Sequence, residues 1–126
     1  MKIIGIAAVT IDGYIARHGL ETVNWSRDLP LFKKQTLNHT VIMGSNTSKS
    51  LVVELDKRRS IVVHREDSPK EIIERVTDEK CFVIGGGKTF SKFADHLTHL
   101  YITPHPLIFG QGVKLFESLG KEIKLK

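Results

Sequence analysis

Short apolar runs recur along the chain, separated by longer polar stretches. Residues 2–9 are apolar at successive positions, which predicts a strand buried on both faces. Similar runs predict further strands at 40–44, 60–63, 81–84 and 100–103. The last of these is ended by Pro104–Pro106, with His105 as a loop residue. The tail, 122–126, alternates polar and apolar residues and predicts a half-exposed strand.

Helical patterns lie between these runs. Residues 25–37 predict a helix with Ser26 as its cap and Pro30 in its first turn. Its inward stripe would consist of Leu29, Phe32 and Leu37. Shorter helices are predicted at 45–51, at 88–97 and from Pro69, the last with Ile72, Ile73 and Val76 facing inward.

The remaining long segment, 10–24, is predicted to be a loop with a turn at Asp12-Gly13. Strands and helices thus alternate along the chain. This alternation predicts an α/β sandwich with a mostly parallel sheet.

Composition bounds the class of protein. With 126 residues, 40% of them hydrophobic, the chain fits one domain spanning 1–126. No apolar run approaches the length of a membrane-spanning helix, so no membrane partner is predicted. The single cysteine, Cys81, excludes an internal disulfide, favours a reducing cytoplasm and is predicted to be a small core residue.

The net charge of +5 attracts anionic partners. The basic residues are spread along the chain rather than clustered in an arm, so anionic small molecules account for this charge as well as nucleic acid does. We predict no nucleic-acid partner, and no metal site.

Three consecutive glycines, Gly85–Gly87, follow the strand predicted at 81–84 and precede a predicted helix. Glycines permit a close approach of a ligand or of another segment, and the start of a helix offers free N–H groups to a phosphate. The spacing is not Gly-x-Gly-x-x-Gly, so a standard dinucleotide fingerprint is not predicted. Gly44 followed by Ser45–Thr47 forms a second strand–turn–helix unit of this kind.

Taken together, the motifs resemble dihydrofolate reductase, nearly without gaps from the first strand to Thr103. The resemblance is carried by Asp28-Leu29-x-x-Phe32-Lys33-x-x-Thr36-Leu37, Val41-Ile42-Met43-Gly44-x-x-Thr47-x-x-Ser50, Ile84-Gly85-Gly86-Gly87 and Leu100-Tyr101-Ile102-Thr103. It implies a three-layer α/β sandwich, with a mixed, mainly parallel sheet and at least one antiparallel C-terminal strand.

The resemblance also implies a pterin site. Asp28 would hold the pterin ring and promote protonation of N5, and Thr103 would hydrogen-bond both Asp28 and the pterin. Burial beside apolar side chains would raise the pKa of Asp28. Arg58 would bind the carboxylate of the glutamate tail. The walls would come from Ile6, Ala7, Leu29, Phe32, Leu51 and Leu55.

The cofactor implied by the resemblance is NADPH. Its pyrophosphate would meet the two glycine turns, where the family typically has a cis peptide between the positions of Gly85 and Gly86. His64 and Arg65 would contact the 2′-phosphate. The nicotinamide would lie against Ala8, Ile15 and Ile84. The remaining predicted contacts are Gly44, Ser45, Asn46, Thr47, Gly87, Lys88 and Thr89.

Some positions depart from the family pattern. Val23, Ser45 and Phe90 stand where the family has tryptophan, arginine and tyrosine. Residues 12–16 and 109–116 look more like a sister family, the pyrimidine reductase of riboflavin biosynthesis. Asp28 favours reduction of dihydrofolate, with the riboflavin-pathway pyrimidine as the alternative substrate and a nucleotide-binding module without turnover as a further alternative.

Typical relatives also continue through a C-terminal hairpin, of which only 122–126 would correspond here. A single short strand would leave the edge of the sheet uncovered. We therefore expect a homodimer that covers this edge or the neighbouring apolar loop with Phe109 and Phe116.

Overall fold

A computed structural model describes residues 1–21, 25–27, 29–50 and 58–124. Within these ranges, five strands form a central sheet in the order β4-β3-β5-β1-β6. Every pairing in this sheet is parallel. Its strands are β1 (Lys2–Thr10), β3 (Thr40–Gly44), β4 (Arg59–Val63), β5 (Lys80–Gly85) and β6 (His99–His105).

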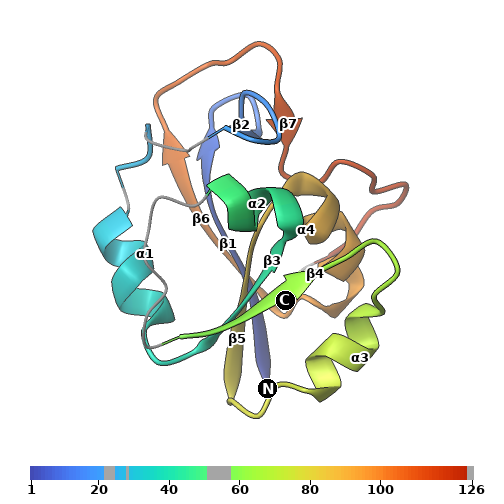
Figure 1. Cartoon of the computed structure of the whole chain (residues 1–126). Helices are drawn as coiled ribbons and strands as arrows, with labels where there is room; N and C mark the ends of the chain where they lie inside the picture. The colour runs from blue at the N-terminus through green and yellow to red at the C-terminus, as the bar shows by residue number, and fades with distance from the viewer. Residues whose placement is uncertain (22–24, 28, 51–57, 125–126) are drawn as a thin grey trace.

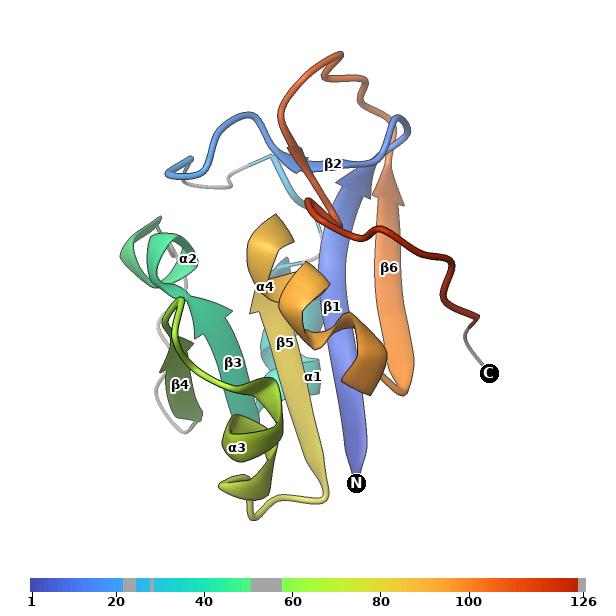
Figure 2. The same cartoon turned by 90° about the vertical axis from the view of Figure 1, so that its right-hand side faces the viewer.

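Helices cover both faces of this sheet (Figures 1 and 2). Helix α1 (Leu29–Thr36) lies on one face, and α3 (Pro69–Glu74) and α4 (Gly87–Phe93) lie on the other. A 3-10 turn (Ala94–His96) extends α4, and α2 (Ser45–Ser50) continues directly from β3. The predicted α/β sandwich with a mainly parallel sheet is confirmed. None of the described helices has the length and apolar character needed to cross a membrane.

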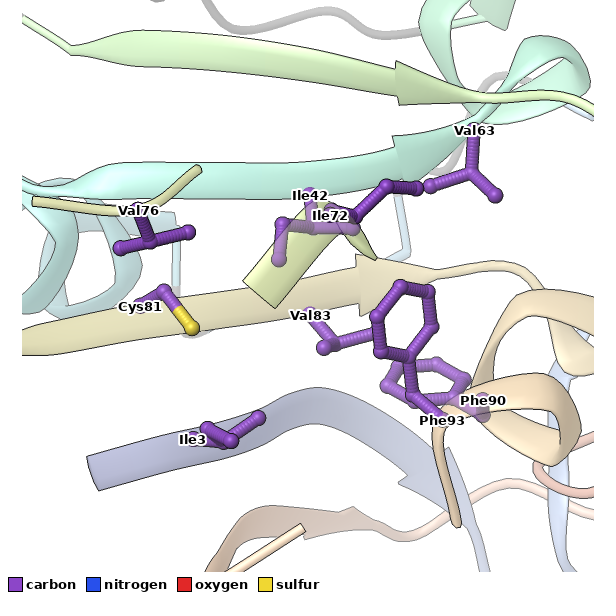
Figure 3. Close-up of a cluster of buried hydrophobic side chains, with 9 residues drawn as sticks. All are labelled: Ile3, Ile42, Val63, Ile72, Val76, Cys81, Val83, Phe90 and Phe93. Atoms are coloured by element: carbon purple, nitrogen blue, oxygen red, sulfur yellow. The ribbon is translucent and has the colours of Figure 1, made fainter. Parts of the chain in front are cut away.

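Alternate strand residues build two cores. On the face of α3 and α4, the buried cluster in Figure 3 joins strand residues such as Ile42 and Val83 to Ile72, Phe90 and Phe93. On the face of α1, Phe32 packs against the strand side chains that point to this other face. Among them are Ile4, Val41, Met43 and Phe82. This two-sided burial explains why the strands are continuous apolar runs.

Cys81 lies in the first of these cores and is fully buried, as predicted. Burial, together with the nearby Asp78 carboxylate, raises the pKa of the Cys81 thiol to about 11. The thiol is therefore protonated at neutral pH and acts as a small apolar side chain.

A short antiparallel ribbon forms a second sheet. It pairs β2 (Tyr14–Ala16) with β7 (Val113–Lys114) and lies above the carboxyl ends of β1 and β6 (Figure 2). The prediction of a continuous loop over 10–24 was wrong at β2. Its partner is almost a hundred residues away in the sequence, so the local pattern carries no signal for the pairing.

Helix α1 begins later than predicted, at Leu29 rather than Trp25. Pro30 lies in its first turn as predicted, whereas Ser26 is three residues before the helix and is not its N-cap. The inward stripe also differs: Leu37 is 42% exposed, and Thr36 is buried in its place. The Thr36 hydroxyl can be buried because it donates to the carbonyl oxygen of Phe32 at 2.8 Å.

Strand β6 runs through Pro104 to His105 and ends before Pro106, so the prediction that it ends at Thr103 was wrong. Within the described sheet β6 pairs only with β1, and an edge strand tolerates a residue without an N–H. Residues 122–124, by contrast, form no strand, although the alternating pattern of the tail predicted one. Alternation alone does not supply the backbone partner that a strand needs.

Candidate active site

A cavity of about 760 Å³ opens at the carboxyl ends of the central strands. Its walls come from the ends of β1, β3, β4 and β5, from the starts of α2 and α4, from α1 and from the ribbon. Parallel sheets bind their ligands at this edge, because the loops and helix starts that follow the strands converge there. The volume is in the range that holds a cofactor or a drug-sized ligand.

One end of the cavity is apolar. Ile6 and Ala7 of β1, Leu29 and Phe32 of α1, and Ile84 of β5 line it. Phe32 and Ile84 also pack against the core on this face of the sheet, which fixes their positions. A flat ring system could lie against this wall and gain free energy from the removal of apolar surface from water.

The glycine turn forms the floor. Gly85 has a φ of +139°, and the Gly85–Gly86 peptide is cis, as expected from the resemblance. Gly44 faces this turn from β3, where a Cβ atom would lie 2.6 Å from the hydroxyl oxygen of Thr89. A side chain at position 44 would therefore separate β3 from α4.

Gly87 has the closest neighbours of the three glycines in this turn. A Cβ atom there would clash with the carbonyl oxygen of Lys114 and with Cγ of Glu117. The segment after β7 lies directly on this glycine, with the Glu117 N–H donating to the Gly87 carbonyl at 3.3 Å. The Ser91 hydroxyl donates to the same carbonyl at 2.8 Å. The absence of a side chain at 87 thus lets the ribbon segment close one wall of the cavity.

Polar residues surround the glycine turn. Ser45, Asn46 and Thr47 line the cavity at the start of α2, and Lys88 and Thr89 line it at the start of α4. Ser45, Asn46 and Lys88 are exposed. This wall combines hydroxyl, amide and ammonium groups, which are suitable donors for the oxygens of a phosphate.

A cationic corner, formed by Arg65 and Lys92 together with His64, lines the cavity after the end of β4. The Lys92 ammonium donates to the carbonyl oxygens of His64 at 3.0 Å and of Arg65 at 2.9 Å. On the other side of the turn, the Asp67 carboxylate accepts from the His64 N–H at 2.8 Å. Lys92 and Asp67 therefore fix the backbone of the turn that follows β4.

The ribbon forms the opposite rim, with Ile15, Ala16 and Val113 lining the cavity. Asp12 ties this rim together: its carboxylate accepts from the Thr10 hydroxyl at 2.6 Å and from the Gly110 N–H at 2.8 Å. The Thr10 hydroxyl hydrogen bond, with backbone donors adding to it, lowers the pKa of Asp12.

Glu21 is a second acidic group near this rim, and it lines the cavity. Burial raises its pKa, but hydrogen bonds from the Arg17 backbone and guanidinium outweigh burial, so that the pKa is lowered overall. The Arg17 guanidinium lies 2.6 Å from the Glu21 carboxylate. Glu21 therefore stays ionised beside its counter-ion.

The structure brings most of the predicted site residues to this one cavity. Asp28, Leu51 and Leu55 lie outside the described residues. Thr103 and Arg58 are described but do not line the cavity. Those that line it are Ile6, Ala7, Ala8, Ile15, Leu29, Phe32, Gly44, Ser45, Asn46, Thr47, His64, Arg65, Ile84, Gly85, Gly86, Gly87, Lys88 and Thr89.

The contacts of Thr103 and Arg58 show where each of them lies instead. Thr103 pairs with Ala8 in the sheet, and its carbonyl oxygen lies 2.9 Å from Nδ1 of His105. Arg58 is held at the end of α1, where its Nε donates to the Thr36 hydroxyl oxygen at 2.8 Å and a terminal nitrogen donates to the Lys33 carbonyl at 2.7 Å.

Several residues that line the cavity were not predicted from the sequence. Val113 and Glu117 arrive through the ribbon, whose pairing has no local signal. Lys92 could have been found, because it lies one helical turn after Lys88 on a helix that starts at the glycine turn.

The fold and the cavity place the chain among α/β proteins that bind ligands at the carboxyl ends of a parallel sheet. Residues 2–110 match the family model of dihydrofolate reductase. The chain is 33% identical over 88 residues to the dihydrofolate reductase of Bacillus subtilis, covering 60% of this chain and 52% of that relative. It is 30% identical over 115 residues to the dihydrofolate reductase of Buchnera aphidicola, covering 82% and 71% of the two chains.

A third relative, dihydrofolate reductase type 8 of Escherichia coli, is 29% identical over 119 residues, covering 78% of this chain and 70% of the relative. The chain therefore belongs to the dihydrofolate reductase family, whose members are NADPH-dependent oxidoreductases. It spans about half the length of the Bacillus relative.

The close approach at Gly87 can be tested by Gly87→Ala. The added methyl group must displace both the Lys114 carbonyl and the Glu117 side chain, so we expect a loss of about 1–3 kcal/mol in the free energy of unfolding. Thermal and urea unfolding followed by circular dichroism measure this loss. Gly120→Ala is the matched control, because a Cβ atom at 120 meets nothing within 4 Å. Equal stability of the two variants would contradict the packing described here.

Proposed function

We propose that this protein reduces 7,8-dihydrofolate to tetrahydrofolate with NADPH. The observation that carries the proposal is that a single cavity is lined both by the glycine turn with its polar and cationic surroundings and by the apolar wall between β1 and α1. A long, phosphorylated cofactor fits the first set of residues, and a flat aromatic substrate fits the second. The curated relatives named above are dihydrofolate reductases, which favours this reaction over the alternatives.

In this proposal the cofactor spans the cavity from the cationic corner to the rim. Ser45–Thr47 and Gly86–Lys88 would bind the pyrophosphate, and His64 and Arg65 would bind the 2′-phosphate. Ala8, Ile15 and Ile84 would pack against the nicotinamide. NADPH supplies the hydride when bound; the protein contributes orientation and the exclusion of water.

The substrate would lie on the apolar wall. Leu29 and Phe32, with Leu51 and Leu55, would hold its aminobenzoyl group, and Ile6 and Ala7 would lie beside its pterin ring. Asp28 would bind the pterin and promote protonation of N5 while C6 receives the hydride, with Thr103 as its hydrogen-bond partner. Arg58 would bind the tail carboxylate; its anchorage to α1 supports this role, because α1 also carries Leu29 and Phe32.

The sequence leaves two alternatives to this reaction. Reduction of the riboflavin-pathway pyrimidine is not favoured, since the relatives found are dihydrofolate reductases. A nucleotide-binding module without turnover would bind NADPH but leave it unoxidised. A cytoplasmic setting is part of the proposal and is supported by the single, buried Cys81.

The proposal predicts that Asp28→Asn abolishes most of the activity. An amide of the same shape cannot promote protonation of N5, so turnover of dihydrofolate should fall by about 10²–10⁴-fold while NADPH still binds. Absorbance of NADPH measures turnover, with dihydrofolate or the riboflavin-pathway pyrimidine as substrate. Asp95→Asn, which removes an exposed carboxylate paired with Lys121, is the control. Unchanged turnover in Asp28→Asn would remove Asp28 from the mechanism.

The cationic corner predicts a cofactor preference that depends on Lys92. Lys92→Met removes a charge and two hydrogen bonds to the backbone of the 64–65 turn. We expect the Kd of NADPH to rise about tenfold and that of NADH to change little, because only NADPH carries the 2′-phosphate. Lys34→Met, on the exposed side of α1, removes the same charge away from the cavity. Equal losses for both cofactors in Lys92→Met would contradict a role specific to the 2′-phosphate.

We also propose a homodimer. The outer edge of β6 has no partner strand among the described residues, and Ile102 on this strand is 39% exposed. Phe116, in contrast, packs on Phe90 within the chain. The edge of β6 is therefore the surface that a second copy would cover. A light-scattering mass equal to one chain at micromolar concentration would reject the dimer.

A further inference from the structure

His105 occupies an unusual position for a histidine. It is the last residue of β6, it pairs with Thr10 in the sheet, and only 3% of it is exposed. The sequence predicted a loop residue between two prolines. Instead, the residue lies at the carboxyl end of β6, and its ring contacts Arg27 in the segment before α1.

Both ring nitrogens of His105 make hydrogen bonds. The backbone N–H of Arg27 donates to Nε2 at 2.9 Å, and Nδ1 lies 2.9 Å from the Thr103 carbonyl oxygen. A backbone N–H can only donate and a carbonyl can only accept, so Nε2 carries the lone pair and Nδ1 carries the proton. One neutral tautomer of the imidazole satisfies both partners.

Aromatic packing reinforces this contact. Trp25 meets the ring of His105 edge-on at 5.3 Å and the ring of Phe109 edge-on at 5.2 Å. The Arg17 guanidinium lies over the Phe109 ring, 4.4 Å from its centroid. The segment Trp25–Arg27 is therefore fixed by a directional hydrogen bond and by two ring contacts, all from residues far away in the sequence.

This segment belongs to the wall of the cavity. Ser26, within it, and Leu29, at the start of α1, both line the cavity. We propose that His105 is a positioning residue for the substrate half of the site: through the Arg27 N–H it sets where the chain enters α1. The inference rests on the proposed function and goes beyond it, because no role in dihydrofolate reduction was assigned to His105, Trp25 or Arg27.

The test compares His105→Gln with His105→Asn and His105→Phe. The oxygen of glutamine reaches the position of Nε2 and can accept from Arg27, whereas asparagine reaches only the position of Nδ1 and phenylalanine makes neither bond. We expect kcat/KM for dihydrofolate to fall about tenfold in His105→Phe and in His105→Asn, because a displaced wall misplaces the substrate. In His105→Gln it should stay within about threefold of the wild type.

Two further readouts separate positioning from general loss of structure. The Kd of NADPH should stay within about twofold in all three variants, since the cofactor residues lie on other elements. Trp25 is the only tryptophan of the chain, so acrylamide quenching of its fluorescence reports on the segment directly. Quenching should increase in His105→Phe and His105→Asn but not in His105→Gln. His99→Phe, an exposed position at the other end of β6, is the control and should change nothing.

Either of two results would overturn the inference: a kcat/KM in His105→Asn equal to that in His105→Gln, or losses of NADPH affinity as large as the losses in kcat/KM. Should His105→Phe fail to fold, the comparison of the two polar variants decides alone. A wild-type protein that consumes no NADPH with dihydrofolate would reject the proposed function instead. The quenching comparison would then decide whether His105 fixes Trp25–Arg27.

Discussion

The close approach of separate chain segments around the glycine turn is the constraint on which the site depends. Gly44 lets Thr89 lie against β3, and Gly87 lets the segment after β7 lie against the start of α4. A side chain at 44 would push Thr89 of α4 away from β3, and a side chain at 87 would push Lys114 and Glu117 away from α4, so in either case a wall of the cavity would move. The glycines thus serve packing and ligand access at once, because a backbone without a side chain is the only surface that both neighbours can approach.

The ribbon gives a physical meaning to the two motifs that resemble the riboflavin-pathway reductase. Asp12, in the first motif, accepts hydrogen bonds from the backbone N–H groups of Phe109 and Gly110, in the second. Strand β2 from the first motif pairs with β7 from the second. Gly112 lies against the carbonyl of Ala16, where a Cβ atom would clash. In this chain each motif holds the other beside the cavity, and this structural role does not specify a pyrimidine substrate.

What could be predicted from the sequence follows from which signals are local. The buried strands are visible because both faces of the sheet are covered, and the glycine turn is visible because three glycines follow a strand. The start of α1 was misplaced because His105 and Phe109 hold Trp25–Arg27 outside the helix, and nothing within 25–37 signals these contacts. Leu37 was placed inward by its apolarity, whereas Thr36 occupies the inward position with its hydroxyl satisfied by Phe32. Lys92 acts on backbone carbonyls nearly thirty residues away, a contact that no spacing rule specifies.

The central claim is that the cavity holds NADPH against two segments, the start of α2 and the glycine turn. Backbone amide chemical shifts of a nitrogen-15-labelled sample, followed as NADPH is added, test this claim most directly. The account predicts that the largest shifts occur at the amides of Ser45–Thr47 and Gly86–Lys88, with further shifts at His64 and Arg65. Shifts confined to other surfaces, or a titration that leaves these amides unchanged at millimolar NADPH, would contradict it.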